Sequence, residues 1–396
     1  MGIFPKKLTR KLADREASNA LRSLGEKEEK TDFYSNDYLG FARHAAIHTW
    51  ASQLVAEANT TLNGATGSRL LSGNHNLYLR LEEYLDRYYG QPSLIFNSGY
   101  DANTGFFSSV PQRGDVVLYD ELAHASIRDG IRMGLAKSYK FEHNDLQDLR
   151  SQILMARKRS NTLENGAVKE DHEIYVVTES VFSMDGDSPD LEEMSKLCSE
   201  LNCRLVVDEA HAIGVCGENA RGTAGAGKMQ NDVFARILTF GKGMGAHGAA
   251  VIGPAELRLF LLNYARSFIY TTALPPHSVA TVLASYHFMD SPEGQKKQWE
   301  LKENIRYFRE QLQDLSIAGL FIPSNSAIHC CLLPGNDRVK AVAAELQLGG
   351  FDVRPILSPT VPGGQERLRF CLHSYNTFKE IKEVLRKLAT SIADHE

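Results

Sequence analysis

Cysteine, excess basic charge and long apolar runs are all scarce in this sequence, and each shortage excludes a class of protein. The six cysteines form no C-x-x-C pair and no spacing typical of disulfide-linked domains, so we expect reduced, mostly buried thiols. A net charge of −5 argues against a general nucleic-acid binder, which would present a basic face. No apolar run approaches the length of a membrane span. These shortages favour a cytoplasmic enzyme that binds neither nucleic acid nor membranes.

Length and composition bound the domain organisation. At 396 residues the chain is too long for one small core, and 43% apolar with 23% charged residues is typical of a soluble globular protein. We expect an N-terminal helical segment at 1–35, a large α/β domain at 36–285 and a smaller α+β domain at 286–396. The helix in the first segment is predicted from leucines spaced for one helical face, namely Leu8, Leu12, Leu21 and Leu24.

Strands and helices alternate through the expected large domain. Several expected strands are continuous apolar runs, which is typical of strands covered by helices on both faces of a largely parallel sheet. These strands are 93–96, 115–119, 138–141, 173–178, 204–207, 236–240 and 249–252. A long charged helix follows from about residue 285, and strands are expected at 327–333 and 367–372. The sequence predicts an α/β fold with a mainly parallel sheet and a smaller α+β C-terminal domain.

Polar residues follow several of these strands. In open α/β sheets, ligand-binding and catalytic residues lie at the carboxyl ends of the strands. Lys242 lies among glycines between two apolar runs, where burial would disfavour its ammonium form and make it a nucleophile towards carbonyls. The amides of Gly99 and Tyr100 begin a helix and could bind a phosphate. Asp208 follows a buried strand, where a carboxylate needs a cation or a donor. Taken singly, Lys242 also fits a surface turn, and the other positions fit ordinary helix caps.

Taken together, these groups describe a site for pyridoxal phosphate. That cofactor needs a lysine for its aldehyde, a partner for its pyridinium nitrogen and a cradle for its phosphate. A metal site is not expected, because His124, His211 and His247 lie on separate segments without cysteine or paired-histidine spacing.

The same residues carry a family likeness over nearly the whole chain. It resembles the α-oxoamine synthases, which are fold-type I pyridoxal phosphate enzymes. The matching stretches are Ser-Asn-Asp-Tyr-Leu-Gly at 35–40, Ser-Gly-Tyr-Asp-Ala-Asn at 98–103, His-Ala-Ser-Ile at 124–127, Asp-Gly-Asp at 185–187, Asp-Glu-Ala-His at 208–211 and Thr-Phe-Gly-Lys at 239–242. The resemblance implies a fold-type I transferase and a homodimer with shared active sites. At 63–69 the chain departs from the family, because Thr66 stands where a second glycine is more usual.

The resemblance also implies roles for individual residues. Lys242 would hold the cofactor as a Schiff base and later serve as the proton-transfer base. Asp208 would pair with the pyridinium nitrogen, His124 would stack on the ring, and His211 would bond to its 3-oxygen. The further cofactor contacts that it implies are Gly99, Tyr100, Glu179, Ser183 and Thr239, with Thr271 or Thr272 from the other subunit.

For the substrate, the resemblance points to three residues. Arg369 would bind the amino acid's carboxylate, although Arg367 lies on the same strand face by period two and the residues alone do not choose between them. Arg22 matches a position near the acyl-thioester pocket, where simple surface solvation also fits, and Asn36 matches one near the substrate.

The implied reaction is a decarboxylative condensation of L-alanine with an acyl thioester. The branch of the family that fits best uses pimeloyl-CoA or pimeloyl-acyl carrier protein in biotin biosynthesis. A sister synthase that uses glycine or serine with another acyl-CoA is the nearest alternative. An aminotransferase of the same fold and a non-catalytic scaffold also stay open.

Overall fold

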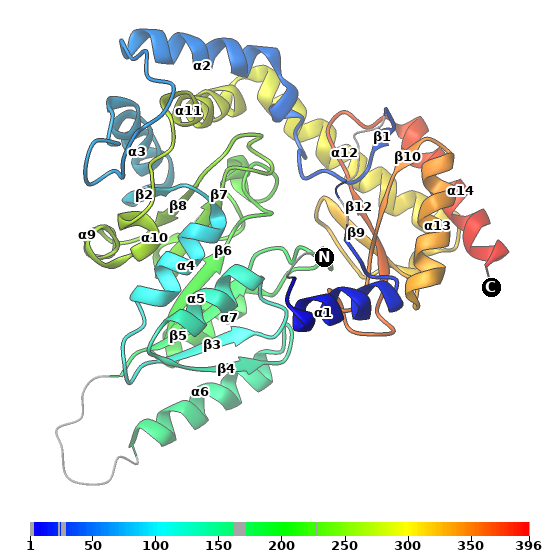
Figure 1. Cartoon of the computed structure of the whole chain (residues 1–396), viewed down its shortest axis with the longest axis horizontal. Helices are drawn as coiled ribbons and strands as arrows, with labels where there is room; N and C mark the ends of the chain where they lie inside the picture. The colour runs from blue at the N-terminus through cyan, green and yellow to red at the C-terminus, as the bar shows by residue number, and fades with distance from the viewer. Residues whose placement is uncertain (1–3, 23, 25–28, 162–171, 226–228, 396) are drawn as a thin grey trace. The chain divides into compact units, whose positions relative to one another are not determined.

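The computed structural model describes residues 4–22, 24, 29–161, 172–225 and 229–395 (Figure 1). The chain forms two compact units. The larger one comprises Asn36–Ser183 and Ser188–Trp299, and the smaller one comprises Met1–Ser35, Met184–Asp187 and Glu300–Glu396. The larger unit therefore runs beyond the expected boundary at 285. The N-terminal segment groups with C-terminal residues rather than standing alone.

A seven-stranded sheet forms the centre of the larger unit, in the order β2-β8-β7-β6-β5-β3-β4. Neighbouring strands are parallel except at β8, which runs antiparallel to both β2 and β7. The strands are β2 (Ser93–Phe96), β3 (Val116–Asp120), β4 (Lys137–Phe141), β5 (Ile174–Glu179), β6 (Arg204–Asp208), β7 (Ala235–Thr239) and β8 (Ala249–Ile252). The predicted α/β fold with a mainly parallel sheet is confirmed.

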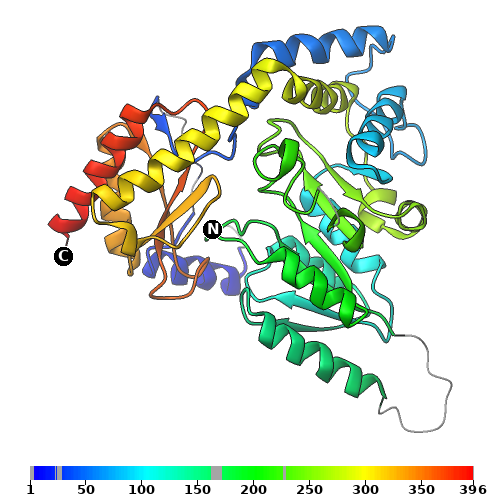
Figure 2. The same ribbon diagram turned by 180° about the vertical axis from the view of Figure 1, so that it is seen from behind.

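Helices cover both faces of this sheet (Figure 1, Figure 2). Val206 packs with the residues of α4 and α5 on one face, while its neighbours Leu205 and Val207 pack with those of α6 and α7 on the other. Successive side chains of a strand point to opposite faces, so a strand buried on both sides is apolar at every position. This is why β5 and β6 appear in the sequence as continuous apolar runs.

The remaining elements of the larger unit connect and flank the sheet. Its helices are α2 (Ala45–Glu57), α3 (Asn76–Tyr89), α4 (Gly99–Ser109), α5 (Ala125–Met133), α6 (Leu146–Asn161), α7 (Leu191–Glu200), α8 (Met229–Asp232), α9 (Ala255–Tyr264), α10 (Arg266–Ile269) and α11 (Pro276–Asp290), with the short turns η1 (Phe41–Arg43) and η2 (Glu218–Ala220). α12 (Pro292–Asp314) begins in this unit and continues in the smaller one.

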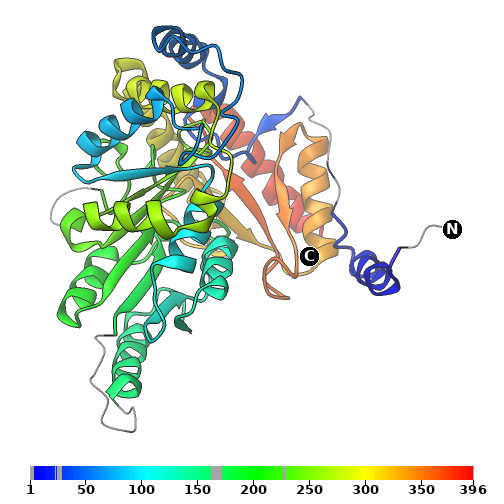
Figure 3. The same ribbon diagram turned by 60° about the vertical axis from the view of Figure 1, so that its left-hand side comes forward.

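The smaller unit is an α+β arrangement around a three-stranded antiparallel sheet of order β11-β12-β9. The strands are β9 (Ile328–Leu332), β11 (Arg354–Ile356) and β12 (Arg367–Cys371), and a separate parallel pair joins β1 (Thr31–Asp32) to β10 (Phe351–Asp352). Its helices are α1 (Lys6–Ala17), η3 (Ala318–Leu320), α13 (Asn336–Leu348) and α14 (Phe378–Asp394). α13 and α14 lie side by side (Figure 3).

The predicted N-terminal helix is too long. α1 ends at Ala17, and Asn19 takes a left-handed φ of 50°, so Leu21 and Leu24 lie beyond the helix. None of the side chains of α1 is buried. The leucine spacing therefore does not mark one continuous helix here. Among the described helices, none is long and apolar enough to cross a membrane.

Candidate active site

Three neighbouring parallel strands end in polar residues. Glu179 and Asp208 are the last residues of β5 and β6 and lie opposite each other in the sheet, while Thr239 is the last residue of β7. The sequence predicted a strand at 204–207 with Asp208 just after it. In the structure, β6 continues through Asp208, which is its last residue. Because parallel strands finish at the same edge, the three side chains are carried to one end of the sheet.

Lys242 lies in the tight connection between β7 and β8. Gly245 N–H donates to the Lys242 carbonyl at 2.8 Å, and Phe240 N–H donates to Gly248 O at 2.9 Å, which closes the loop at its base. Gly245 has a φ of 60°, and a Cβ there would overlap the backbone of Ala42. This close approach fixes the loop against η1. Lys242 is therefore half-buried on an ordered hairpin, and it does not lie in a flexible surface turn.

The Lys242 amine begins a hydrogen-bonded chain. Its Nζ lies 2.7 Å from His211 Nε2, and His211 Nδ1 lies 2.7 Å from the Tyr38 hydroxyl. Tyr38 in turn donates to Asn36 Oδ1 at 3.1 Å. With Tyr38 donating to Asn36, the His211 tautomer that fits both contacts carries its proton on Nδ1, donates it to the tyrosine oxygen and accepts from the lysine at Nε2. His211 is buried, which holds this geometry in place.

Asp208 is surrounded by donors. Ala210 N–H donates to its Oδ1 at 2.9 Å, and Asn103 Nδ2 donates to its Oδ2 at 2.8 Å. A buried carboxylate that accepts from both sides is held in a single orientation. The structure thereby places a fixed negative charge at the end of β6.

His124 and Glu179 complete the group around Lys242. His124 N–H donates to Glu179 Oε1 at 2.6 Å. Burial is the largest effect on both side chains, and it lowers the pKa of His124 and raises the pKa of Glu179 to about 8. The charges of Asp208 and Lys242 act on both of them as well, so all four groups lie within electrostatic reach of one another.

The start of α4 forms an anion cradle with the end of β7. Ser98 caps the helix by accepting from Asp101 N–H at 3.1 Å, whereas the amides of Gly99 and Tyr100 donate to no acceptor within the described part of the chain. A Cβ at Gly99 would overlap the Thr239 hydroxyl, so only glycine lets that hydroxyl approach the helix start. Unpaired helix-start amides beside a hydroxyl are suited to phosphate.

The other predicted cofactor residues are placed less tightly. The Tyr100 hydroxyl donates to Asp129 at 2.7 Å. Asn97 Nδ2 donates to Thr271 Oγ1 at 3.1 Å and to the Thr272 carbonyl, both in the same chain. Ser183 lies half-buried in the turn that follows β5. A contribution of either threonine across a dimer stays a prediction.

Two predicted substrate residues belong to the smaller unit. Arg22 is exposed and donates to Thr360 Oγ1 at 3.3 Å. Arg369 is buried in β12 and contacts Cys371 Sγ at 2.9 Å. Arg367, on the same strand, forms an ion pair with Asp185 at 2.5 Å and also donates to the Met184 carbonyl. Arg367 is therefore committed to a structural pair, and the binding of a substrate carboxylate by Arg369 stays a prediction.

Sequence reasoning gave no role to Tyr38, Asn103 or Ser126, although all three lie within the matching stretches. Tyr38 orients His211, Asn103 donates to Asp208, and Ser126 Oγ lies 2.7 Å from His124 Nδ1. Asn103 follows Gly99 by four residues on α4, which places it one helical turn beyond the anion cradle. This spacing of four residues could have identified Asn103 from the sequence as a residue near the cofactor site.

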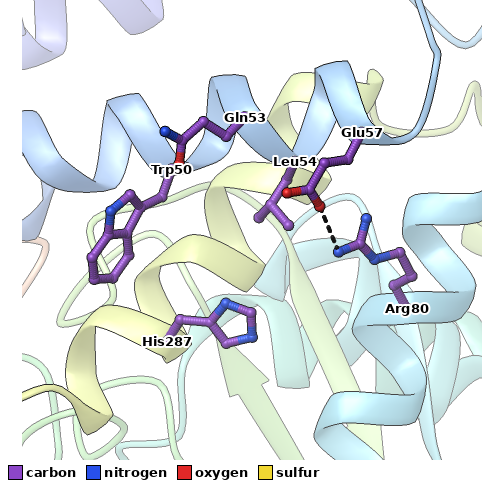
Figure 4. Close-up of a pocket in the computed structure, with 6 residues that line it drawn as sticks. All are labelled: Trp50, Gln53, Leu54, Glu57, Arg80 and His287. Atoms are coloured by element: carbon purple, nitrogen blue, oxygen red, sulfur yellow. Dashed lines mark hydrogen bonds and ion pairs between the residues drawn. The ribbon is translucent and has the colours of Figure 1, made fainter.

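A separate pocket of about 440 Å³ opens between α2, α3 and α11 (Figure 4). Arg80 and Glu57 form an ion pair across it at 3.3 Å. Its lining residues are Trp50, Gln53, Leu54, Glu57, Arg80 and His287. None of them is a predicted cofactor or substrate residue.

Known proteins share this arrangement of sequence and fold. The family model for aminotransferases of class I and II matches residues 28–388. The chain belongs to this family. Among curated relatives, an 8-amino-7-oxononanoate synthase of Emericella nidulans is 38% identical, covering 91% of this chain and 88% of its own. One from Geobacter sulfurreducens is 36% identical, covering 96% and 94%. The predicted resemblance to α-oxoamine synthases is confirmed.

Solved structures agree with this membership of the aminotransferase family. The serine palmitoyltransferase of Sphingomonas wittichii is 25% identical, with a TM-score of 0.84 over 99% of both chains. An 8-amino-7-oxononanoate synthase of Francisella tularensis, at 24% identity, shares the fold with a TM-score of 0.74 over 93% of this chain and 99% of its own. The fold is that of the fold-type I transferases, and the chain is a pyridoxal-phosphate-dependent transferase.

The residues present fit this cofactor. An amine on an ordered loop, a fixed carboxylate and an anion cradle that a Cβ at Gly99 would fill are the three groups that pyridoxal phosphate requires. All of them lie at the end of one sheet, within one compact unit.

Proposed function

We propose that the chain condenses L-alanine with a pimeloyl thioester and releases CO2 and the free thiol. The product would be 8-amino-7-oxononanoate, a step of biotin biosynthesis. The observation that carries this proposal is the Lys242–His211 contact of 2.7 Å at the sheet edge that also holds Asp208. The curated relatives named above support this choice of reaction.

In this proposal the cofactor is held by residues of the larger unit. Lys242 would hold it covalently, Asp208 would pair with its ring nitrogen, and Gly99 with Thr239 would hold its phosphate. Bound pyridoxal phosphate supplies an attachment for the amino acid's nitrogen and a ring that stabilises negative charge at the α-carbon. The carboxylate of Asp208 would favour a proton on that ring nitrogen, because a nearby negative charge stabilises the protonated form.

Lys242 is the proposed base for the α-proton of alanine. An amine can accept a proton only while it is neutral. His211 Nε2 lies 2.7 Å from Lys242 Nζ, so it can accept a hydrogen bond from the proton that would otherwise stay on Nζ alone. Tyr38 and Asn36 hold His211 in the tautomer that makes this possible. The chain from Asn36 to Lys242 therefore orients the base and supports its change of protonation state.

Binding of the substrate carboxylate is assigned to Arg369. A guanidinium binds a carboxylate through two parallel hydrogen bonds, which fixes the orientation of the amino acid. Arg22 and Asn36 are proposed contacts on the substrate side. Glu179, Ser183, His124 and Tyr100 are proposed to line the cofactor pocket, with Thr271 or Thr272 reaching it from the partner of a homodimer.

A second candidate is a sister synthase that acts on serine or glycine with another acyl-CoA. The high structural similarity to a serine palmitoyltransferase, with a TM-score of 0.84, favours keeping this candidate. The two candidates differ only in the amino acid and the acyl chain, and the chemistry at Lys242 is the same for both.

Product analysis separates them. The holoenzyme is supplied with alanine, glycine or serine together with pimeloyl-, acetyl-, succinyl- or palmitoyl-CoA and with pimeloyl-acyl carrier protein. Free thiol and amino ketone are then measured by colorimetry and mass spectrometry. We expect turnover with alanine and a pimeloyl thioester, and none in Lys242→Ala. Turnover with another pair alone would assign the sister activity, and conversion of an amino acid to its keto acid without thiol release would indicate an aminotransferase.

A further inference from the structure

A chain of hydrogen bonds that includes two residues without an assigned role joins Asp208 to His124. Asn103 Nδ2 donates to Asp208 Oδ2 at 2.8 Å and to Ser126 Oγ at 3.0 Å. Ser126 Oγ lies 2.7 Å from His124 Nδ1, and Ser126 N–H donates to the same nitrogen at 3.3 Å. Asn103 and Ser126 are only 2% and 1% exposed. The chain is therefore shielded from water, which would otherwise satisfy each group separately.

The direction of each bond follows from its ends. Asp208 already accepts from Ala210 N–H, and a carboxylate offers only acceptors, so the amide nitrogen of Asn103 must face it. The second hydrogen of that nitrogen goes to Ser126 Oγ. Ser126 then has its own proton left to donate to His124. A ring nitrogen that accepts from a hydroxyl and a backbone amide carries no proton, so the neutral His124 ring has its proton on Nε2.

The amide oxygen of Asn103 gives an independent observation. Asn103 Oδ1 is buried and accepts no hydrogen bond from any described residue. A buried carbonyl oxygen without a donor is unfavourable. Reversing the amide would let Oδ1 accept from Ser126, but it would then face Asp208 Oδ2 as a second acceptor. The charge of Asp208 therefore selects an orientation that leaves one amide atom unsatisfied.

We propose that Asn103 is a positioning residue that transmits the charge of Asp208 through Ser126 and holds His124 in its Nε2–H form. This inference rests on the proposed cofactor site, in which Asp208 and His124 serve the same bound ring.

The surroundings of His124 favour a neutral imidazole ring, and the proposed control of its tautomer requires that the ring be neutral. Burial lowers the pKa of His124 and is the largest effect. The positive charges of Lys242 and Arg128 lower it further, while Asp208 and Asp129 oppose them. A neutral ring has two tautomers, and the serine hydroxyl distinguishes between them.

The tautomer can be measured directly in the holoenzyme. Histidine labelled with ¹⁵N is incorporated into deuterated protein, and the two ring nitrogens are identified from their long-range couplings to the ring protons. The His124→Gln variant assigns the signal among the 13 histidines of the chain. We expect an acceptor-type shift for Nδ1 and an N–H-type shift for Nε2 at neutral pH.

Two variants and a matched control test the proposed transmission. In Asn103→Leu and in Ser126→Ala, we expect the tautomer ratio of His124 to move towards Nδ1–H by about fivefold, which is the size of one hydrogen bond's net effect. Thr104→Val is the control. Thr104 is also buried on α4, but among the described residues its hydroxyl donates to the carbonyls of Tyr100 and Asp101 and not to the chain of Asn103. This variant should leave the ratio unchanged.

Each outcome decides the matter. An Nδ1–H ring in the unaltered protein would overturn the proposal, as would an unchanged ratio in the two variants with Asn103 or Ser126 replaced. Should Asn103→Leu fail to fold, Ser126→Ala decides alone, because it removes one hydroxyl and keeps Asn103 in place. Absence of any condensing activity would refute the proposed function, but it would not alter the tautomer result, so the two failures are distinguishable.

Discussion

Replacing Glu179 by glutamine should make the stability of the protein less dependent on pH. Glu179 is 3% exposed, and burial, followed by the charge of Asp208, raises the pKa of its carboxyl group to about 8. Glutamine has the same shape and keeps an oxygen that can accept from His124 N–H. The variant therefore removes the titration while it preserves the hydrogen bond.

The expected magnitude follows from the two pKa values. In the unfolded chain the carboxyl titrates near 4.5, and in the folded protein near 8. Between these pH values the folded state holds a proton that the unfolded state has lost, so the free energy of unfolding of the unaltered protein falls as the pH rises. The fall amounts to about 1.4 kcal/mol per pH unit and levels off above pH 8, at about 5 kcal/mol at most. Glu179→Gln should not show this fall.

Urea unfolding at intervals from pH 5 to pH 9 measures the difference in stability between the variant and the unaltered protein. The protein is used without cofactor, so that the Lys242 amine keeps the charge that acts on Glu179. Glu83→Gln, an exposed glutamate on α3, controls for the general loss of one negative charge. We expect the stability of Glu179→Gln relative to the unaltered protein to rise with pH up to about pH 8 and then to level off, and that of Glu83→Gln to stay level throughout. A flat difference for Glu179→Gln would show that the buried carboxyl is already ionised at pH 5, and the reasoning from burial would then be wrong.

Three further outcomes test other parts of the structure. Asp208→Ala should bind cofactor weakly and lose condensing activity by a thousandfold or more while circular dichroism stays native, since the fixed charge stabilises every charged state at the ring; near-normal turnover would contradict this assignment. Arg367→Ala should lower the free energy of unfolding by about 3 kcal/mol, because it leaves Asp185 without its partner. Arg369→Lys should leave the stability nearly unchanged and raise the KM for alanine about tenfold. If Arg369→Lys lowered the stability and Arg367→Ala raised the KM instead, the roles of the two arginines would be exchanged. Thr66→Gly should raise the stability by about 1 kcal/mol in thermal unfolding because Thr66 is exposed at a left-handed φ of 59°, and Thr66→Ala, which keeps the strain, should not.

The strands were predictable from the sequence because their burial is unusual. β5 and β6 are covered on both faces, and each therefore appears as an uninterrupted apolar run. The predicted ends were less accurate, since apolar runs stop before Glu179 and Asp208 while the strand pairing continues through them. Pairing depends on backbone groups that hydropathy does not report. The two-residue strands β1 and β10 were missed because so short a segment has no period.

The sequence by itself determined the chemistry of this protein: a lysine among glycines, a carboxylate after an apolar run and a helix start with glycine predict a pyridoxal phosphate site. Tertiary structure alone decided which side chains support that site. Arg367 and Arg369 are equivalent by strand period, and the structure shows that Arg367 is the one that pairs with Asp185. Asn103 meets Asp208 across 105 residues of chain. Local patterns reflect the periods of strands and helices, whereas hydrogen-bond partners far apart in the chain are set by how those elements pack.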